Sequence, residues 1–102
     1  MAISNTVLST ITGAVYTSSN DSATTALYLC NVSGSTVTFN LYAVPNGDSQ
    51  GDQHTLYSFV SLEPNDTYVI DTEKLIMSNG DTIQGNCSAN TAVTVTVSYI
   101  GI

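Results

Sequence analysis

The chain has 102 residues, 42% of them apolar, which is the length and composition of one folded domain with a modest core. Only 9% of the residues are charged, against about 25% in an ordinary soluble domain, and the formal net charge is −7. Lys74 is the only lysine and there is no arginine, so the chain lacks the basic clusters that bind nucleic acid or anionic membranes. We therefore expect neither partner, and a surface made mainly of hydroxyl and amide groups.

The N-terminal segment carries neither a basic region nor a continuous apolar run, and no stretch approaches the roughly 20 apolar residues that span a membrane. We therefore expect a protein that folds in a cytoplasm without a cleaved signal peptide. Residues 1–12 are nevertheless partly apolar, with Ile3, Val7, Leu8 and Ile11. Two roles are open for this segment: pairing within the domain, or extending as an N-terminal arm onto a neighbour.

Alternation of apolar and polar residues predicts β-strands along most of the chain. In residues 37–43 Val, Phe, Leu and Ala alternate with Thr, Asn and Tyr, and in residues 93–99 Val and Tyr alternate with Thr and Ser. Such alternation is typical of an antiparallel sheet with one buried face. We predict about eight strands, at roughly 6–10, 13–17, 24–32, 36–44, 54–62, 66–71, 81–88 and 92–100.

Two segments depart from simple alternation. Residues 23–32 carry apolar side chains on both faces, such as Leu27 and Tyr28, which predicts a central strand covered on both sides. Residues 71–78 fit either a strand or a single helical turn, and we favour the strand.

Turn residues separate the predicted strands. Ser33-Gly34 predicts a tight hairpin, Pro64-Asn65-Asp66 a type I turn, and Asn79-Gly80 a hairpin with a type I′ turn. Short strands with turns between them predict an all-β fold, a single antiparallel β-sandwich domain over residues 1–102. Jelly-roll and immunoglobulin-like connectivity both fit, because they differ in strand order rather than in strand pattern.

Cys30 and Cys87 are the only cysteines. Their separation is similar to that of the disulfide between the two sheets of an immunoglobulin domain. However, the chain has no Trp to pack on such a bridge, and Gly85 stands where the tyrosine of a tyrosine corner would be. Without an export signal we expect two free thiols, with a disulfide as the alternative.

No arrangement of residues predicts catalysis, a cofactor or a metal ion. His54 is the only histidine, and no nucleophile motif accompanies it. Asn46, Asp48 and Asp52 supply oxygen atoms in one loop, but their spacing does not match a calcium-binding EF-hand loop. We expect His54 to be a surface or capping residue and the acidic loop to be solvated.

Tyrosines on strands are the remaining candidates for function. Tyr42 and Tyr68 alternate with residues that we expect in the core, so we expect both to face outward. Tyrosine is common at protein interfaces. The candidate interface residues are therefore Tyr42 and Tyr68, together with Val7, Leu8 and Ile11 of the N-terminal segment.

Two long motifs carry a family resemblance. One is "ALYLCNVSGSTVTFNLYAVPNGDS" at residues 26–49; the other is "NDTYVIDTEKLIMSNGDTI" at residues 65–83, followed by a Ser/Ala/Asn turn and a Val/Thr strand ending in "SYI". With these motifs the chain, from about residue 23 onward, resembles the small all-β virion proteins encoded in the structural modules of tailed bacteriophages. The resemblance implies a β-sandwich that docks on the capsid, neck or tail, and it brings no catalytic residue.

From this resemblance we expect a non-enzymatic capsid decoration (cement) protein that binds and stabilises the assembled head. The implied partners are the major capsid protein or other virion proteins, with a homo-oligomer such as a trimer, in a virion assembled in the host cytoplasm. The alternatives are a neck, tail or baseplate component, and a carbohydrate- or receptor-binding module supported by the outward tyrosines.

Overall fold

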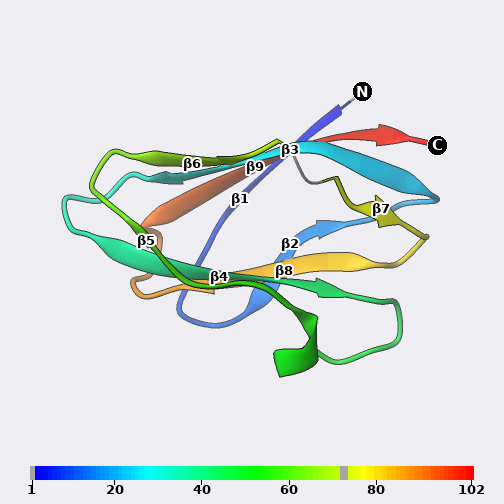
Figure 1. Cartoon of the computed structure of the whole chain (residues 1–102), viewed down its shortest axis with the longest axis horizontal. Coiled ribbons are helices and arrows are strands. Elements are labelled where there is room, and N and C mark those ends of the chain that lie inside the picture. The colour runs from blue at the N-terminus through cyan, green and yellow to red at the C-terminus, as the bar shows by residue number, and fades with distance from the viewer. Residues whose placement is uncertain (1, 72–73) are drawn as a thin grey trace.

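The computed structural model describes residues 2–71 and 74–102, and in them the chain forms nine β-strands and one short 3₁₀-helix (Figure 1). These are β1 (Ala2–Val7), β2 (Gly13–Thr17), β3 (Ser22–Asn31), β4 (Val37–Val44), η1 (Asp52–His54), β5 (Thr55–Leu62), β6 (Thr67–Ile70), β7 (Ile76–Met77), β8 (Thr82–Cys87) and β9 (Val93–Gly101). The strands predicted from residue 13 onward fall close to these bounds, whereas the first strand, predicted at 6–10, lies at Ala2–Val7 instead. No helix in the described ranges has the length and apolar character to cross a membrane.

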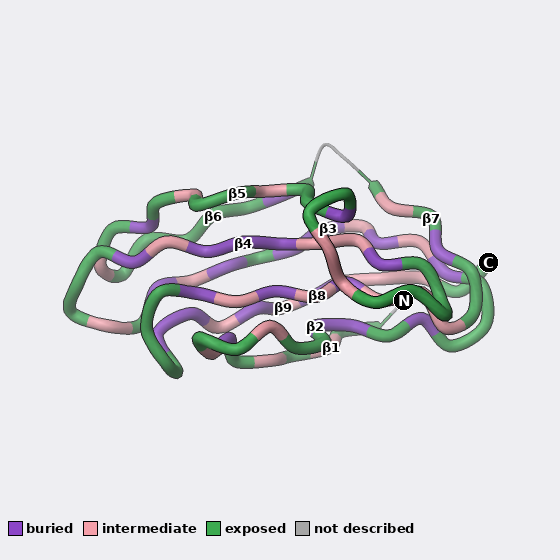
Figure 2. The backbone as a smooth tube through the Cα atoms, turned by 90° about the horizontal axis from the view of Figure 1, so that it is seen from below, coloured by how far each residue is buried: buried purple, intermediate pink, exposed green. Residues whose placement is uncertain are grey.

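The strands form two antiparallel sheets that pack face to face. Sheet A has five strands in the order β1-β9-β3-β6, with β7 also paired to β3, and sheet B has four in the order β2-β8-β4-β5. Figure 2 shows β1 and β2 along one side of the sandwich and β5 and β6 along the other. The predicted all-β antiparallel sandwich is therefore confirmed.

The order of pairing identifies the connectivity. β4 pairs with β5, β3 with β6, β2 with β8 and β1 with β9, so the pairs are nested inside one another along the chain. Such nesting arises when one long antiparallel ribbon is rolled up, and the result is the two-sheet jelly roll. Of the two connectivities that the sequence left open, the chain adopts the jelly roll, with β7 as a short addition between β6 and β8.

The inner faces of the two sheets make the core. Their fully buried apolar side chains are Leu29, Val93, Val95 and Val97 from sheet A and Phe39, Leu41 and Ile83 from sheet B. Each such side chain contributes roughly 1.5–3 kcal/mol relative to an exposed one. The alternation predicted for residues 37–43 and 93–99 thus points its apolar set inward.

Strand β3 is central, as predicted, but it is not covered on both sides. Leu27 and Leu29 face the core at 3% and 0% exposure, whereas Tyr28 is 43% exposed and Val32, just after the strand, is 54% exposed. The second face of β3 is the outer face of sheet A, where Tyr28 remains exposed. The presence of apolar side chains on both faces of β3 therefore did not mean that both faces are buried.

The N-terminal segment pairs within the domain, which is the first of the two roles that the sequence left open. Residues 2–7 pair with β9 in continuous register, from Ala2 opposite Tyr99 to Val7 opposite Thr94. Leu8 then turns into the core at 2% exposure, where its side chain lies against Gly85.

The segment at residues 71–78 contains β7, in line with the favoured strand prediction, but β7 is only two residues long. Thr72 and Glu73 lie outside the described residues. Lys74 donates hydrogen bonds from Nζ to the backbone carbonyl oxygens of Asp71 and, at 2.9 Å, Thr25.

The turns differ from the predictions, and all three join one sheet to the other. Ser33-Gly34 leads from β3 in sheet A to β4 in sheet B, so it makes no hairpin. Asn65 and Gly80 have positive φ angles of 64° and 89° at the third position of their turns, which is the signature of type II turns. The predicted type I turn at residues 64–66 and type I′ turn at residues 79–80 are therefore wrong.

The two cysteines are free thiols, as expected. Cys87 is buried in sheet B opposite Phe39, and its Sγ donates a hydrogen bond to the carbonyl oxygen of Ala89. Cys30 lies in sheet A opposite Thr94, on the outer face, and is half-buried. The two side chains belong to different sheets and only one faces the core, so they do not meet.

Asn31 holds three segments together at one end of the sandwich. Its side chain is fully buried, and Nδ2 donates to the carbonyl oxygens of Ser35 at 2.8 Å and Leu62 at 3.0 Å. Its Oδ1 accepts from the backbone N–H and the hydroxyl of Ser33. One amide therefore satisfies polar groups of the β3–β4 connection and of the end of β5.

We predict that Asn31→Ala lowers the free energy of unfolding by roughly 2–4 kcal/mol, because it leaves buried carbonyl and N–H groups without partners. The measurement is urea unfolding followed by circular dichroism. Asn90→Ala is the matched control: the Asn90 amide accepts hydrogen bonds from Thr10 at an exposed site, where water replaces it, so we expect less than about 1 kcal/mol. Equal losses in the two variants would contradict the assigned role of Asn31.

Candidate interaction surface

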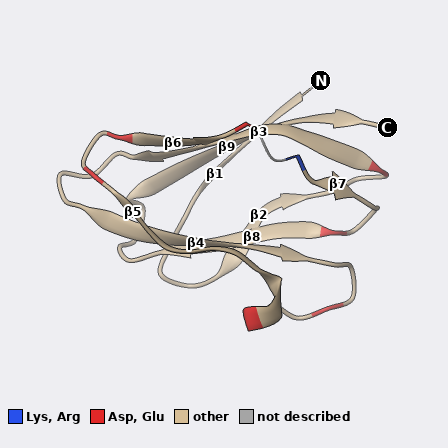
Figure 3. Cartoon of the chain, viewed as in Figure 1, with Lys and Arg blue, Asp and Glu red and all other residues tan. Residues whose placement is uncertain are grey.

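No described strand carries an Asp, Glu, Lys or Arg residue. Every described acidic residue lies in a connection or in η1, and Lys74 lies between β6 and β7 (Figure 3). The coloured positions in Figure 3 accordingly sit at the ends and margins of the sandwich. Among the described residues, the strands that form both broad faces therefore carry no charged side chain, although the formal net charge of the chain is −7.

The outer face of sheet A is the more apolar of the two. Strand register places Tyr28 opposite Val69 on one side and opposite Thr96 on the other. Tyr28 is 43% exposed and Val69 is 45% exposed. Ile3 and Val7 on β1 share this face and are 69% and 51% exposed. We call the outward side chains of β1, β9, β3 and β6 the outer A face.

The outer face of sheet B is built on a chain of amides. The Nδ2 of Asn40 donates to Asn86 Oδ1 at 2.7 Å, and the Nδ2 of Asn86 donates to Thr12 Oγ1 at 2.7 Å. Asn40 Oδ1 accepts from the backbone N–H of Phe59 at 2.8 Å. These bonds tie together β5, β4, β8 and the β1–β2 connection, so the middle of this face presents fixed polar groups, and the exposed large apolar side chains of sheet B lie on the edge strand β5.

The five interface candidates from the sequence do not form one surface. Tyr42 does face outward, half-buried on sheet B, where it lies opposite Gln84. Val7 belongs to the outer A face, and Ile11 is 78% exposed in the β1–β2 connection. Leu8 is buried in the core and cannot contact a partner directly.

Tyr68 lies on the inner side of β6 and is still 36% exposed at the margin of the sandwich, so its side chain does not point outward from the sheet as predicted. It lies opposite Leu29 in the β3–β6 pair, and its ring centroid is 5.7 Å from that of Phe39 and 5.9 Å from that of Tyr57. Val69 takes the outward position instead. A short strand such as β6 gives too few alternations to fix its phase, and a slip of one residue exchanges the two faces.

Two exposed aromatic residues were missed by the sequence reasoning. Tyr28 was assigned to a covered strand, although its alternation with Leu27 and Leu29 already placed it opposite the core. Phe59 is 73% exposed with a φ of 50°, where β5 has an extra residue relative to β4. A positive φ is rare for a bulky side chain, and the sequence carries no sign of this bulge.

His54 anchors the long β4–β5 connection. It is 8% exposed, its Nδ1 accepts the backbone N–H of Gly51 at 3.0 Å, and its Nε2 lies 3.3 Å from Asp48 Oδ2. Because Nδ1 accepts, the ring proton is on Nε2 and is directed at the Asp48 carboxylate. The capping role expected for His54 fits this geometry, although the side chain is buried rather than on the surface.

Asn46, Asp48 and Asp52 of the acidic loop are exposed, as expected, although some polar groups in and beside the loop have partners within the chain. Asp48 is paired with His54, and the Asp81 carboxylate accepts the backbone N–H groups of Asn46 and Ser78, each at 2.9 Å. Among the residues that the structure describes, no group of three His, Cys, Asp or Glu side chains is arranged to hold a metal ion.

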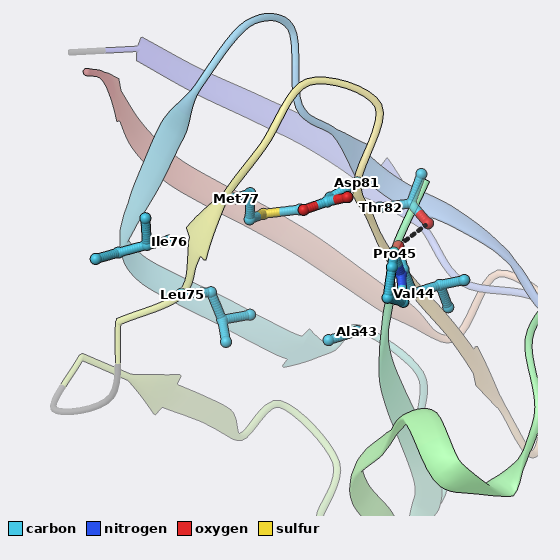
Figure 4. Close-up of a pocket in the computed structure, with 8 residues that line it drawn as sticks. All are labelled: Ala43, Val44, Pro45, Leu75, Ile76, Met77, Asp81 and Thr82. Atoms are coloured by element: carbon cyan, nitrogen blue, oxygen red, sulfur yellow. Dashed lines mark hydrogen bonds between the residues drawn. The ribbon is translucent and has the colours of Figure 1, made fainter. Parts of the chain in front are cut away.

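The hollow next to this loop is small. It lies between the end of β4 and residues 75–77, with Asp81 and Thr82 at its rim, and has a volume of about 110 Å³ (Figure 4). Sites for small molecules are usually about 300–1,000 Å³. A shallow depression of about 380 Å³ also runs along β1 and β9, lined by Asn5, Val7 and Thr96 among others. It is an open surface at the margin of the outer A face.

Comparisons with family models, with curated proteins and with solved structures find no significant match to this chain. The likeness to phage virion proteins therefore depends on the two motifs quoted above.

We predict that Tyr68→Ala lowers the free energy of unfolding by roughly 2–3 kcal/mol, since it removes ring contacts with the core. Val69→Ala, one residue along the same strand, is expected to cost less than about 1 kcal/mol, because that side chain faces solvent. Urea unfolding of the two variants checks the phase of β6. A larger loss for Val69→Ala would mean that β6 pairs with β3 in the other register.

Proposed function

We propose that this protein is a non-enzymatic structural component of a tailed-bacteriophage virion, and that it attaches to the assembled head as a decoration protein through the outer A face. The observation that carries the proposal is the absence of charged residues from every described strand. The choice of a phage head as the partner rests on the motifs at residues 26–49 and 65–83, which resemble those of phage virion proteins.

A neutral sheet face is suited to burial against another protein. The buried centre of an interface is depleted in charged residues and enriched in aromatic ones, because an unpaired charge taken out of water costs several kcal/mol. The outer A face presents Tyr28 and Val69 side by side, flanked by threonines of β9, with no charge to desolvate. The outer face of sheet B supports the same role less well, since its amides are already bonded to one another.

The acidic connections suit the same setting. With one lysine and no arginine, the chain has no means of neutralising several phosphates, so it would not be retained on packaged or newly made DNA. Acidic groups at the ends of the sandwich also favour solubility while leaving the faces free for contact.

Stabilisation of the head would follow from linkage. A protein that binds only the assembled shell stabilises that shell by RT ln(1 + [L]/Kd) per site, or about 2.7 kcal/mol when its free concentration is a hundred times Kd. The stabilising free energies of many equivalent sites add up, so a modest contact that is repeated over the head strongly opposes disassembly.

Two alternatives remain open. A neck, tail or baseplate component would use the same neutral face but at far fewer copies per particle. A glycan-binding module would use the exposed Tyr28 ring as a stacking surface, and saturable binding of the protein to a glycan would support it.

We predict saturable co-sedimentation of the purified protein with mature heads that lack it, at on the order of hundreds of copies per head, and no binding to isolated tails. The double variant Tyr28→Lys with Val69→Lys is expected to weaken binding at least tenfold, which corresponds to about 1.4 kcal/mol. Circular dichroism of the variant checks that it remains folded.

Tyr42→Lys is the matched control, because it places the same charge at a tyrosine on the opposite face. Loss of binding by Tyr42→Lys alone would assign the contact to sheet B. Binding to tails only would favour the neck, tail or baseplate alternative, and binding to neither particle would contradict the virion proposal.

A further inference from the structure

Three of the four sheet edges are interrupted. On β2 the register shifts between Ala14 and Tyr16, and on β5 it shifts twice, next to the positive φ of Phe59. The edge next to β3 is divided between β6 and β7, which are four and two residues long. Bulges and short strands of this kind prevent a sheet edge from pairing with another chain.

The fourth edge, β1, has none of these features. It pairs with β9 over six residues without a register shift, and its sequence AISNTV contains no charge, proline or glycine. No other strand in the described part of the chain pairs with it. Its free side therefore presents a row of unpaired backbone groups in a regular, neutral strand.

We propose that β1 pairs antiparallel with β1 of a second copy of this chain, about a two-fold axis at Asn5. This register places Ile3 of each copy opposite Val7 of the other on the outer A face, because residues equally far from Asn5 on either side meet. On the inner face it places Ser4 opposite Thr6. Asn5 meets itself at the axis, where two amides can exchange hydrogen bonds.

In this register each pair of directly opposite residues is chemically matched. Directly opposite side chains in antiparallel strands have Cβ atoms about 4.5–5.5 Å apart, and apolar β-branched pairs and hydroxyl pairs are both favourable there. A shift of two residues in either direction would set Asn5 opposite Ile3 or Val7 and shorten the ladder. The register centred on Asn5 therefore gives the longest pairing and the best match of side chains.

Charge does not oppose the contact, although both copies are acidic. The described Asp and Glu residues all lie in connections, and β1 and its neighbour β9 carry none. The joined sheet would run from β6 of one copy to β6 of the other and would double the neutral outer A face. The dimer concerns the protein alone, so its test succeeds or fails independently of attachment to a virion.

The first test is sedimentation of the purified protein over a concentration series. We expect a monomer–dimer equilibrium, and we expect Asn5→Lys to raise the dimer dissociation constant at least tenfold, because it sets two lysines face to face at the axis. Ala14→Lys is the matched control on the edge strand β2 and should leave the equilibrium unchanged. A monomer at every concentration, or a dimer that survives Asn5→Lys, would overturn the proposal.

The second test fixes the register by cross-linking, in a background where Cys30→Ser removes the half-buried thiol. Ile3→Cys mixed with Val7→Cys should give a disulfide-linked dimer on oxidation, because these positions are directly opposite. Either variant alone should not, since like positions are about 13 Å apart along the strands. Equal cross-linking by a single variant alone would exclude the register centred on Asn5.

Discussion

The packing of two sheets through one layer of fully buried aliphatic and aromatic side chains is the interaction on which the rest of the structure depends. Leu29 and the valines of β9 meet Phe39, Leu41 and Ile83 across this layer, and β3, β4, β8 and β9 contribute about every second residue to the core. The other residues of each strand then lie on an outer face. Because these outer residues are Thr, Ser, Asn, Tyr and aliphatic ones, the sandwich has two broad surfaces without charge.

Hydrogen bonds between single polar side chains and the backbone hold the connections at the ends of the sandwich. Asn31 joins three segments at one end, and Asp81 and His54 fix the connections at the other through bonds to backbone N–H groups. Each of these bonds contributes only about 1 kcal/mol, but leaving its buried partner unsatisfied would cost more. A chain with 9% charged residues can therefore close a jelly roll, provided that its connections are rich in short polar side chains.

The strands and the fold class could be predicted because the alternation in residues 37–43 and 93–99 records the buried layer directly. The connectivity could not be predicted, because a local residue pattern does not show which strands pair with one another. The orientation of Tyr68 was predicted wrongly because β6 is too short to fix the phase of its alternation. The exposure of Tyr28 was missed because apolar residues on both faces of β3 suggested that both faces are covered. The bulge at Phe59 and the burial of Leu8 depend on distant partners, namely Asn40 and Gly85, which no local reading reveals.

The neutral outer A face is proposed to be the surface through which the protein meets its partner, while the acidic connections stay in solvent. The most direct measurement is an electron cryomicroscopy reconstruction of heads to which the purified protein has been added. The account predicts that β3, β6 and β9 face the shell, with Tyr28 and Val69 at the contact and the acidic connections turned away. Density in which sheet B or an acidic end of the sandwich faces the shell, or heads without added density, would contradict it.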